Sequence, residues 1–332
     1  MPTQNNQQEK ELPQVLILRT TFVFQLYEKE FHKKFKVLKA WESPLPIESF
    51  IESEAQNVEA IFCSGLTPIT KDIISQLPLL KIVVTESTGL EHIDMGECKR
   101  KGIAVTYAGS VYAEDVADMA IGLVIDVLRK ISMADRFIRN GLWPSGVQFP
   151  MGSKVGGKRV GIVGLGNIGL MIARRLEGFG CTISYNSRKK KGSTPYKFYT
   201  DVVEMASDND VLIVCCSLTE QTRHIINNEV LRALGKDGVL INVGRGAIIN
   251  EDDLVECLIE GEIAGVGLDV FEHEPNVPKQ LFTMENVVMT PHRAAFTKEG
   301  FFDVFQLVMG NLEAFFSDKP LLTPVPVPIA NE

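Results

Sequence analysis

The segment Lys158-Arg-Val-Gly-Ile-Val-Gly-Leu-Gly-Asn-Ile-Gly169 decides the fold of this 332-residue chain. An apolar run, Val160–Val163, leads into a Gly-x-Gly-x-x-Gly motif, and a helical pattern continues through Leu176. A strand, a tight glycine turn and a helix start form the cradle of a dinucleotide pyrophosphate, which meets the free N–H groups of the helix. The residues expected to hold the pyrophosphate are Gly164, Gly166, Asn167, Ile168 and Gly169.

The residues after the next predicted strand, Thr182–Tyr185, indicate which dinucleotide binds. An NAD-binding site carries Asp or Glu here for the ribose 2′-hydroxyl, whereas this chain has Asn186, Ser187, Arg188 and three lysines. Serine and arginine bind a 2′-phosphate through charge-assisted hydrogen bonds, and a carboxylate would repel it. The alternative is that the basic residues Arg188–Lys191 form a solvent-exposed loop that binds no ligand. At this position in the motif we favour NADP(H), with Ser187, Arg188 and Lys189 as its contacts.

The overall composition limits the class of protein. A hydrophobic content of 45% and a charged content of 23% are ordinary for a globular protein, and the net charge of −8 disfavours binding to nucleic acid or an anionic membrane. The polar N-terminus resembles neither a secretory signal nor a transit peptide, and no apolar run reaches membrane-spanning length. Six scattered cysteines without a Cys-x-x-Cys pair favour reduced thiols and a cytoplasmic location. No metal is expected.

Short apolar runs alternate with helical patterns through nearly the whole chain, which predicts parallel sheets. In the first half, the predicted strands are Val15–Leu18, Val37–Leu38, Ala60–Cys63, Ile82–Thr85 and Ile103–Val105. Residues 112–140 read as one long helix, and the series resumes after residue 158. We therefore predict an α/β protein with two doubly wound domains and a cleft between them. A flavodoxin-like substrate domain comprises residues 1–108 and 298–332, and a Rossmann cofactor domain comprises residues 109–297. The Pro-rich segment Leu321–Ile329 is expected to lie extended on the first domain.

Three segments beyond the glycine motif place charged side chains at predicted strand ends. They are Asn242–Gly246, Leu268–Pro275 and Thr290–His292. Ligands of open α/β sheets bind at this edge. A site that reduces a small 2-oxo acid needs a cation for the carboxylate and carbonyl oxygens and a proton donor for the new hydroxyl group, while the cofactor supplies hydride.

With these segments the chain resembles the D-isomer-specific 2-hydroxyacid dehydrogenases over nearly its full length. The motifs that carry the resemblance are Gly89–Asp94, Glu114–Asp118, Gly164–Gly169, Thr219–Thr222, Gly244–Gly246, Leu268–Pro275 and Pro291–His292. Within the family, Glu114–Arg129 and Tyr185–Lys190 are most similar to the plant NADP-dependent glyoxylate/hydroxypyruvate and hydroxyphenylpyruvate reductases.

The resemblance implies a role for each matching residue. Arg245 would bind the substrate and polarise its carbonyl group, His292 would be the acid/base, and Glu274 would pair with His292. Asp269 would hold the nicotinamide carboxamide. The other positions expected to line the cofactor site are Cys215, Ser217, Thr222 and Val243, and those expected to contact the substrate are Ser64, Thr88 and Gly89. A carboxylate beside His292 favours the imidazolium that protonates the nascent alkoxide, and the planar fork of Arg245 suits two oxygens better than lysine would.

Several alternatives remain open from the sequence. Glu272 is the alternative to Glu274 as the carboxylate paired with His292. Arg293 departs from the family pattern, and an added cation there would affect substrate choice. The first function expected is NADPH-dependent reduction of hydroxypyruvate or glyoxylate, and the second is reduction of an aromatic 2-oxo acid such as hydroxyphenylpyruvate. A third is a non-catalytic dinucleotide sensor or corepressor, which the intact Arg245, Glu274 and His292 disfavour. The resemblance also implies a homodimer, and it leaves open whether Trp143 reaches a neighbouring subunit's site.

Overall fold

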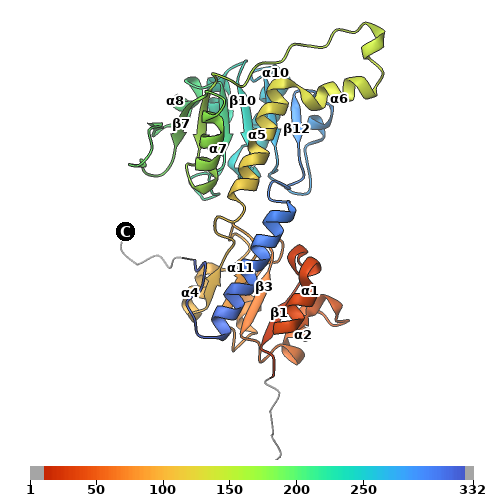
Figure 1. Cartoon of the computed structure of the whole chain (residues 1–332), viewed down its shortest axis with the longest axis vertical. Coiled ribbons are helices and arrows are strands. Elements are labelled where there is room, and N and C mark those ends of the chain that lie inside the picture. The colour runs from red at the N-terminus through yellow and green to blue at the C-terminus, as the bar shows by residue number, and fades with distance from the viewer. Residues whose placement is uncertain (1–10, 326–332) are drawn as a thin grey trace, which may run out of the picture. The chain divides into compact units, whose positions relative to one another are not determined.

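The computed structural model describes residues 11–325, which divide into two compact units. Unit 1 contains the chain up to Tyr112 and from Thr297 onward, and unit 2 is Ala113–Phe296. The sequence analysis places the boundaries after residues 108 and 297, and its assignment of a substrate domain and a cofactor domain stays a prediction. Figure 1 shows the chain of both units.

Unit 1 is built on a five-stranded parallel sheet with the order β2-β1-β3-β4-β5. Its strands are β1 (Gln14–Ile17), β2 (Lys36–Lys39), β3 (Ala60–Cys63), β4 (Ile82–Thr85) and β5 (Ala104–Thr106). Its helices are α1 (Phe22–Lys34), α2 (Ile47–Glu54), α3 (Lys71–Ser75), α4 (Met95–Lys101) and α11 (Lys298–Phe316), with a 3-10 turn η1 (Ala40–Glu42). This is the strand order of flavodoxin-like doubly wound folds.

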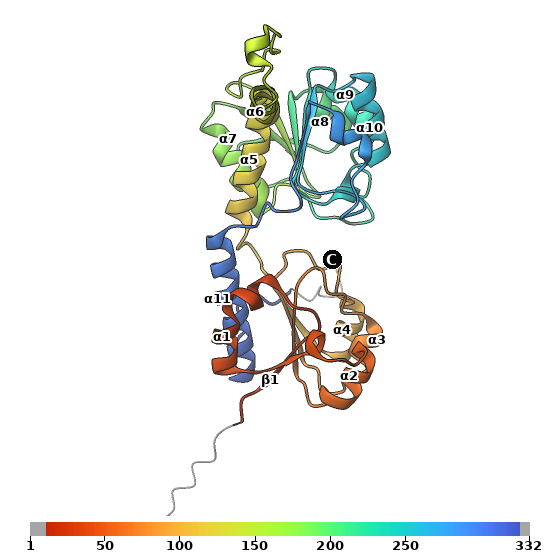
Figure 2. The same ribbon diagram turned by 90° about the vertical axis from the view of Figure 1, so that its right-hand side faces the viewer.

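The helices of unit 1 cover both faces of the sheet, as the wholly buried strands β3 and β4 require. In Figure 2, α1 and α11 lie on one face and α2, α3 and α4 on the other. The C-terminal helix α11 packs against α1 and β4, so the last part of the chain completes the unit that the first part begins. After it, Thr323–Val325 runs antiparallel to β5, where Val325 N donates to Val105 O at 2.8 Å. The rest of the predicted extended segment, 326–329, lies outside the described residues.

Unit 2 is built on a seven-stranded parallel sheet with the order β12-β11-β10-β9-β6-β7-β8. Its strands are β6 (Arg159–Val163), β7 (Thr182–Asn186), β8 (Lys197–Tyr199), β9 (Val211–Val214), β10 (Val239–Asn242), β11 (Gly265–Leu268) and β12 (Val287–Met289). Its helices are α5 (Ala113–Arg129), α6 (Ile131–Arg139), α7 (Asn167–Glu177), α8 (Val202–Ser207), α9 (Asn228–Leu234) and α10 (Glu251–Glu260). Its 3-10 turns are η2 (Trp143–Ser145), η3 (Gly246–Ile248) and η4 (Lys279–Thr283).

The strand order of unit 2 reverses direction between β6 and β9. Counted from β6, the order is that of a Rossmann fold with one added strand, and ligands of such sheets bind beyond the strand ends at the reversal point. Helices α5 and α7 cover one face, and α8, α9 and α10 cover the other (Figure 2). The prediction of two parallel-sheet α/β domains is confirmed.

The prediction of one long helix over residues 112–140 is wrong. Helix α5 ends at Arg129, and α6 starts at Ile131 after Lys130, which has a left-handed backbone with φ of 57°. The carboxylate of Asp126 accepts hydrogen bonds from the N–H and hydroxyl groups of Ser132 at the start of α6. The apolar spacing continues across this break, so periodicity alone could not locate it.

Glu86, directly after β4, is an acidic side chain buried in unit 1. Its exposed fraction is 8%, and in the described part of the chain its Oε2 atom has no hydrogen-bond partner. Burial raises the pKa of Glu86 from 4.5 to about 7, although hydrogen bonds from the Thr21 hydroxyl and Val23 N–H oppose the shift. The folded protein therefore binds more protons here than the unfolded chain between these two values.

Replacement of Glu86 by glutamine is expected to stabilise the protein in alkaline solution. Because the folded-state pKa is raised, the wild type loses stability as the pH rises from 4.5 through 7, and the full loss is present at pH 8. At 1.36 kcal/mol per pH unit the shift corresponds to about 3 kcal/mol. Urea unfolding at pH 4.5 and 8 checks this, with Glu59→Gln at a more exposed ion pair as the control. An equal stability difference at both pH values would contradict it.

Candidate active site

The glycine turn lies where the strand order reverses. Gly164, directly after β6, has φ of +103°, and a Cβ atom there would lie 2.6 Å from the backbone of Cys216 after β9. Only glycine therefore allows this approach of the two strand ends. Gly166 is the N-cap of α7 and offers no side chain to the first N–H groups of the helix, and a Cβ atom on it would meet open space. The helix start therefore presents donors that fit an anion such as a pyrophosphate.

The loop after β7 presents the basic residues predicted from the sequence. The side chain of Asn186 donates to the carbonyl groups of Tyr199 and Thr200, so it faces the protein rather than a ribose. Ser187 Oγ donates to Lys189 O at 2.8 Å, and the buried Tyr185 hydroxyl accepts from Lys191 N. The loop is thus fixed at two points while Arg188 is exposed beside it. The exposed cationic side chains of Arg188, Lys189 and Lys190 suit a phosphate monoester better than a pair of hydroxyl groups.

The loop after β9 is held by short side-chain contacts. Cys215 Sγ donates to Gly164 O at 3.1 Å, which joins this loop to the glycine turn. Thr222 Oγ1 donates to Ser217 O at 2.7 Å and accepts from Thr219 N at 2.7 Å, so residues 217–222 form a closed turn. Burial raises the pKa of the Cys216 thiol to about 11, and that of Cys215 further still, so both stay protonated.

The loop that carries Arg245 packs directly on the loop after β11. The buried Asn242 side chain accepts from Gly244 N and donates to Arg245 O, both at 3.0 Å, and it shapes the turn after β10. A Cβ atom on Gly246 would lie 1.8 Å from the carbonyl carbon of Phe271, so no side chain fits between the two loops. Val243 is buried, and its N–H group donates to Val214 O. The Arg245 backbone is therefore fixed relative to the segment that carries Glu274.

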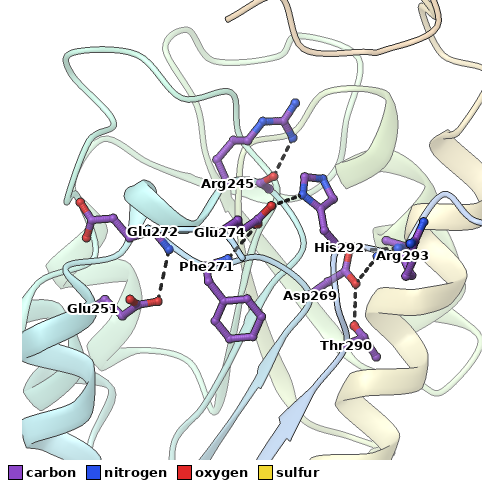
Figure 3. A network of polar contacts seen from close by, with 11 residues as sticks. Arg245, Glu251, Asp269, Phe271, Glu272, Glu274, Thr290, His292 and Arg293 are labelled. Carbon is purple, nitrogen blue, oxygen red and sulfur yellow. Dashed lines mark hydrogen bonds and ion pairs between the residues drawn. The ribbon is translucent and has the colours of Figure 1, made fainter. Parts of the chain in front are cut away.

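His292 and Glu274 form a hydrogen-bonded pair (Figure 3). His292 Nδ1 lies 2.8 Å from Glu274 Oε2, and the other carboxylate oxygen accepts from Phe271 N at 3.0 Å. Burial on its own raises the pKa of Glu274, but the bond with His292, the Phe271 N–H group and the Arg245 charge outweigh it, and the net pKa is lowered. A charged Glu274 faces Nδ1, which leaves Nε2 of His292 for a reacting group.

Asp269 holds the turn on which His292 lies. Its carboxylate is 1% exposed and accepts from Thr290 Oγ1 at 2.6 Å and from the backbone N–H groups of Arg293 and Ala294. The carbonyl group of Asp269 accepts from His292 N at 2.7 Å. His292 has φ of 53°, a left-handed conformation that costs a non-glycine residue energy and that these bonds maintain. The predicted nicotinamide contact stays a prediction, and the contacts present serve the geometry of His292.

The rival Glu272 is occupied elsewhere. Its Oε1 atom accepts from Arg223 Nη2 at 2.6 Å and from His224 Nε2 at 2.8 Å, and Figure 3 shows its carboxylate pointing away from that of Glu274.

Arg293, whose side chain the sequence links to substrate choice, has its guanidinium 4.2 Å from the centroid of the Phe296 ring. Asn242 and Thr290 were not among the predicted site residues, although both stand at strand ends beside them.

The three predicted substrate contacts in unit 1 lie at the carboxyl edge of its sheet. Ser64 follows β3, and Thr88 and Gly89 follow the adjacent strand β4. A Cβ atom on Gly65 would lie 2.8 Å from Ser87 Oγ, so the two loops touch. The loops lie at one edge of the sheet of this unit, and the contact of these residues with a substrate stays a prediction.

The chain belongs to the D-isomer specific 2-hydroxyacid dehydrogenase family, whose NAD binding domain matches residues 121–294. The resemblance predicted from the motifs is confirmed. The chain is 50% identical to a glyoxylate/hydroxypyruvate reductase of Arabidopsis thaliana over 96% of this chain and 98% of that protein. It is 48% identical to a hydroxyphenylpyruvate reductase of Plectranthus scutellarioides, over 90% and 95% of the two chains. It also resembles the solved structure of an NADPH-dependent glyoxylate/hydroxypyruvate reductase of Sinorhizobium meliloti in complex with NADP and malonate, with a TM-score of 0.87, 36% identity, and coverage of 94% and 96%.

Proposed function

We propose that this protein reduces hydroxypyruvate or glyoxylate to the corresponding D-2-hydroxy acid with NADPH. The observation that carries the proposal is the 2.8 Å contact between His292 and Glu274 on the loop cluster that also carries Arg245. The names of the Arabidopsis and Sinorhizobium relatives support the substrate class, and the NADPH-dependent Sinorhizobium enzyme supports the cofactor.

The residues of unit 2 divide the chemistry as follows. NADPH, when bound, supplies the hydride. The start of α7 and the turn Gly164–Gly169 would hold the pyrophosphate, and Ser187, Arg188 and Lys189 would hold the 2′-phosphate. Arg245 binds the substrate carboxylate and polarises the carbonyl group, since a guanidinium reaches two oxygens at once. His292 gives its Nε2 proton to the carbonyl oxygen of the substrate, and Glu274 holds the imidazole ring through Nδ1.

Residues of unit 1 complete the proposal. The backbone N–H groups of Thr88 and Gly89 bind the substrate carboxylate, and the loop around Ser64 contacts the group that distinguishes one 2-oxo acid from another. Support for these roles comes from the family resemblance and from the position of both loops at one edge of the sheet.

A second candidate substrate is 4-hydroxyphenylpyruvate, because the Plectranthus relative is named a hydroxyphenylpyruvate reductase. The two candidates differ only in the group attached to the 2-oxo acid, so the same cofactor and acid/base residues serve both. Comparison of kcat/KM for hydroxypyruvate, glyoxylate and 4-hydroxyphenylpyruvate ranks them. A preference for the aromatic acid of tenfold or more, on the order of the selectivity that one pocket provides, would replace the first candidate by the second.

Replacement of Arg188 by alanine is expected to raise the KM for NADPH about tenfold to a hundredfold, the loss of a charge-assisted hydrogen bond. The KM for NADH should change little, because NADH has no 2′-phosphate. Steady-state kinetics with both cofactors measure the difference. Lys236→Ala, at an exposed position on the surface of unit 2, controls for a general change in charge. An equal effect on both cofactors would exclude Arg188 as the phosphate contact.

We also propose that the protein is a homodimer. Helix α6 has no buried residue, and it and the following segment project from the rest of unit 2 in Figure 1. Large exposed apolar side chains gather there, namely Ile131, Ile138, Leu142, Trp143, Val147 and Met151. Trp143 is 72% exposed and Met151 is 94% exposed, which is typical of a surface that a partner covers.

Sedimentation velocity at micromolar concentration is expected to show a dimer. Trp143→Glu together with Met151→Glu should yield monomers, because a charge in the centre of an apolar interface is costly. Ile259→Glu places the same charge on another exposed apolar residue, on α10, and should leave the dimer intact. A monomeric wild type would exclude the proposal.

The proposed location is the cytoplasm. In support, all six cysteines, each within the described residues, are free thiols, as expected where glutathione keeps thiols reduced. In residues 11–325 no helix is long and apolar enough to cross a membrane. Fractionation of cells that express the tagged protein tests the location.

A further inference from the structure

The Glu272 carboxylate lies near the proposed catalytic pair and accepts two hydrogen bonds, and the proposed chemistry gives it no role. Its side chain is 9% exposed, yet it carries two close cationic or potentially cationic partners, Arg223 and His224. Its backbone N–H group donates to Glu251 Oε1 at 3.2 Å. A buried carboxylate with these partners fixes whatever segments it joins, because removing it leaves the partners unsatisfied.

The two segments that Glu272 joins carry the two halves of the proposed site. Arg223 and His224 directly follow Thr222, in the closed turn that the cofactor is proposed to contact. Glu272 is two residues before Glu274, and the intervening backbone is fixed by the bond from Phe271 N to Glu274 Oε1. His224 adds a second link, since its N–H group donates to Ala247 O in the turn after Arg245.

We infer that Glu272 is a positioning residue that couples the cofactor loop, residues 217–224, to the placement of Glu274 beside His292. The inference rests on the proposed roles of Glu274 and His292. Glu272 touches neither of their side chains in Figure 3, and it acts through the backbone of Phe271–Glu274. Loss of the ion pairs of Glu272 should therefore weaken NADPH binding at the cofactor loop and also displace Glu274 from His292.

The test is a double-mutant cycle between Glu272→Gln and Glu274→Gln, with kcat and the Kd for NADPH measured for each variant. Glu274→Gln should lower kcat and leave the Kd for NADPH unchanged. Glu272→Gln should weaken NADPH binding severalfold and lower kcat about tenfold to a hundredfold, the cost of misplacing a reacting group by about 1 Å. In the double variant the NADPH loss should persist, while kcat should fall no further than in Glu274→Gln alone, because residues that act through each other are not additive.

Glu97→Gln is the matched control, because Glu97 is also a buried carboxylate paired with an arginine, Arg100, but lies on α4 in unit 1. It should lower the thermal midpoint without changing kcat or the Kd for NADPH. Arg223→Gln removes the same ion pair at a residue that is 53% exposed, so it is the alternative variant if Glu272→Gln folds poorly. It should show the same losses in NADPH binding and kcat that are expected of Glu272→Gln.

The outcomes separate the inference from the function on which it rests. If Glu274→Gln lowers kcat but the losses in the cycle multiply, or if NADPH binding is unchanged in Glu272→Gln and Arg223→Gln, the coupling is wrong and the proposed function stands. If Glu274→Gln leaves kcat at the wild-type value, the role of Glu274 is wrong and the inference falls with it.

Discussion

Replacement of His292 by asparagine is expected to lower kcat for 2-oxo acid reduction by about 10²–10⁴-fold, the usual contribution of a positioned general acid. Asparagine is the informative substitution because His292 has φ of 53°, and asparagine accepts this left-handed backbone more readily than alanine. The amide cannot transfer a proton from the position of Nε2. NADPH binding should be retained, since the proposed pyrophosphate and phosphate contacts are elsewhere.

The matched control for His292 is His273, an exposed histidine next to Glu274. His273→Asn should leave kcat within about twofold of the wild type, as expected of a surface position without a role in the chemistry. Single-turnover reduction with bound NADPH separates loss of chemistry from loss of binding. Undiminished turnover in His292→Asn would exclude His292 as the proton donor.

Replacement of Arg245 is expected to have the second largest effect. Arg245→Ala should lower kcat/KM for hydroxypyruvate by about 10²–10³-fold, the cost of removing a preorganised group that stabilises developing charge. Arg245→Lys should recover only part of this loss, because an ammonium group lacks the planar fork that reaches the carboxylate and carbonyl oxygens together. The KM for NADPH should not change in either variant.

Arg232→Ala is the control for Arg245, because it removes a guanidinium from the surface of α9, where it pairs with Glu260 and Glu262. It should leave kcat/KM unchanged. The substrate series sharpens the result: both Arg245 variants should lose activity with every 2-oxo acid, since all share the carboxylate and carbonyl groups. Wild-type activity of Arg245→Lys would show that only the charge matters.

The features that could be predicted from the sequence depend on local chemistry. The glycine turn follows from the spacing Gly164-x-Gly166-x-x-Gly169, and the close approach of Cys216 to Gly164 shows why a side chain is excluded there. Fully apolar strands such as Val211–Val214 indicate a buried parallel sheet in any context. The sequence likewise shows that no acidic residue directly follows β7.

Features that depend on contacts between distant segments could not be predicted. Glu272 and Glu274 both follow β11, and the difference between them is that Arg223 and His224, almost 50 positions earlier, bind the first of the two. The sequence does not indicate that the carboxylate of Asp269 accepts hydrogen bonds from the turn after β12. Glu86 was not singled out, because nothing in its neighbours reveals that it is buried.

The proposed activity of this protein is the reduction of 2-oxo acids by NADPH. Its most direct test is the initial rate of NADPH oxidation by the full chain with hydroxypyruvate, compared with 4-hydroxyphenylpyruvate and with NADH, followed by the configuration of the product. We predict rapid NADPH oxidation, slower turnover with NADH, and a product of D configuration. Tight NADPH binding without turnover of hydroxypyruvate, glyoxylate or 4-hydroxyphenylpyruvate would contradict the account and favour a dinucleotide sensor.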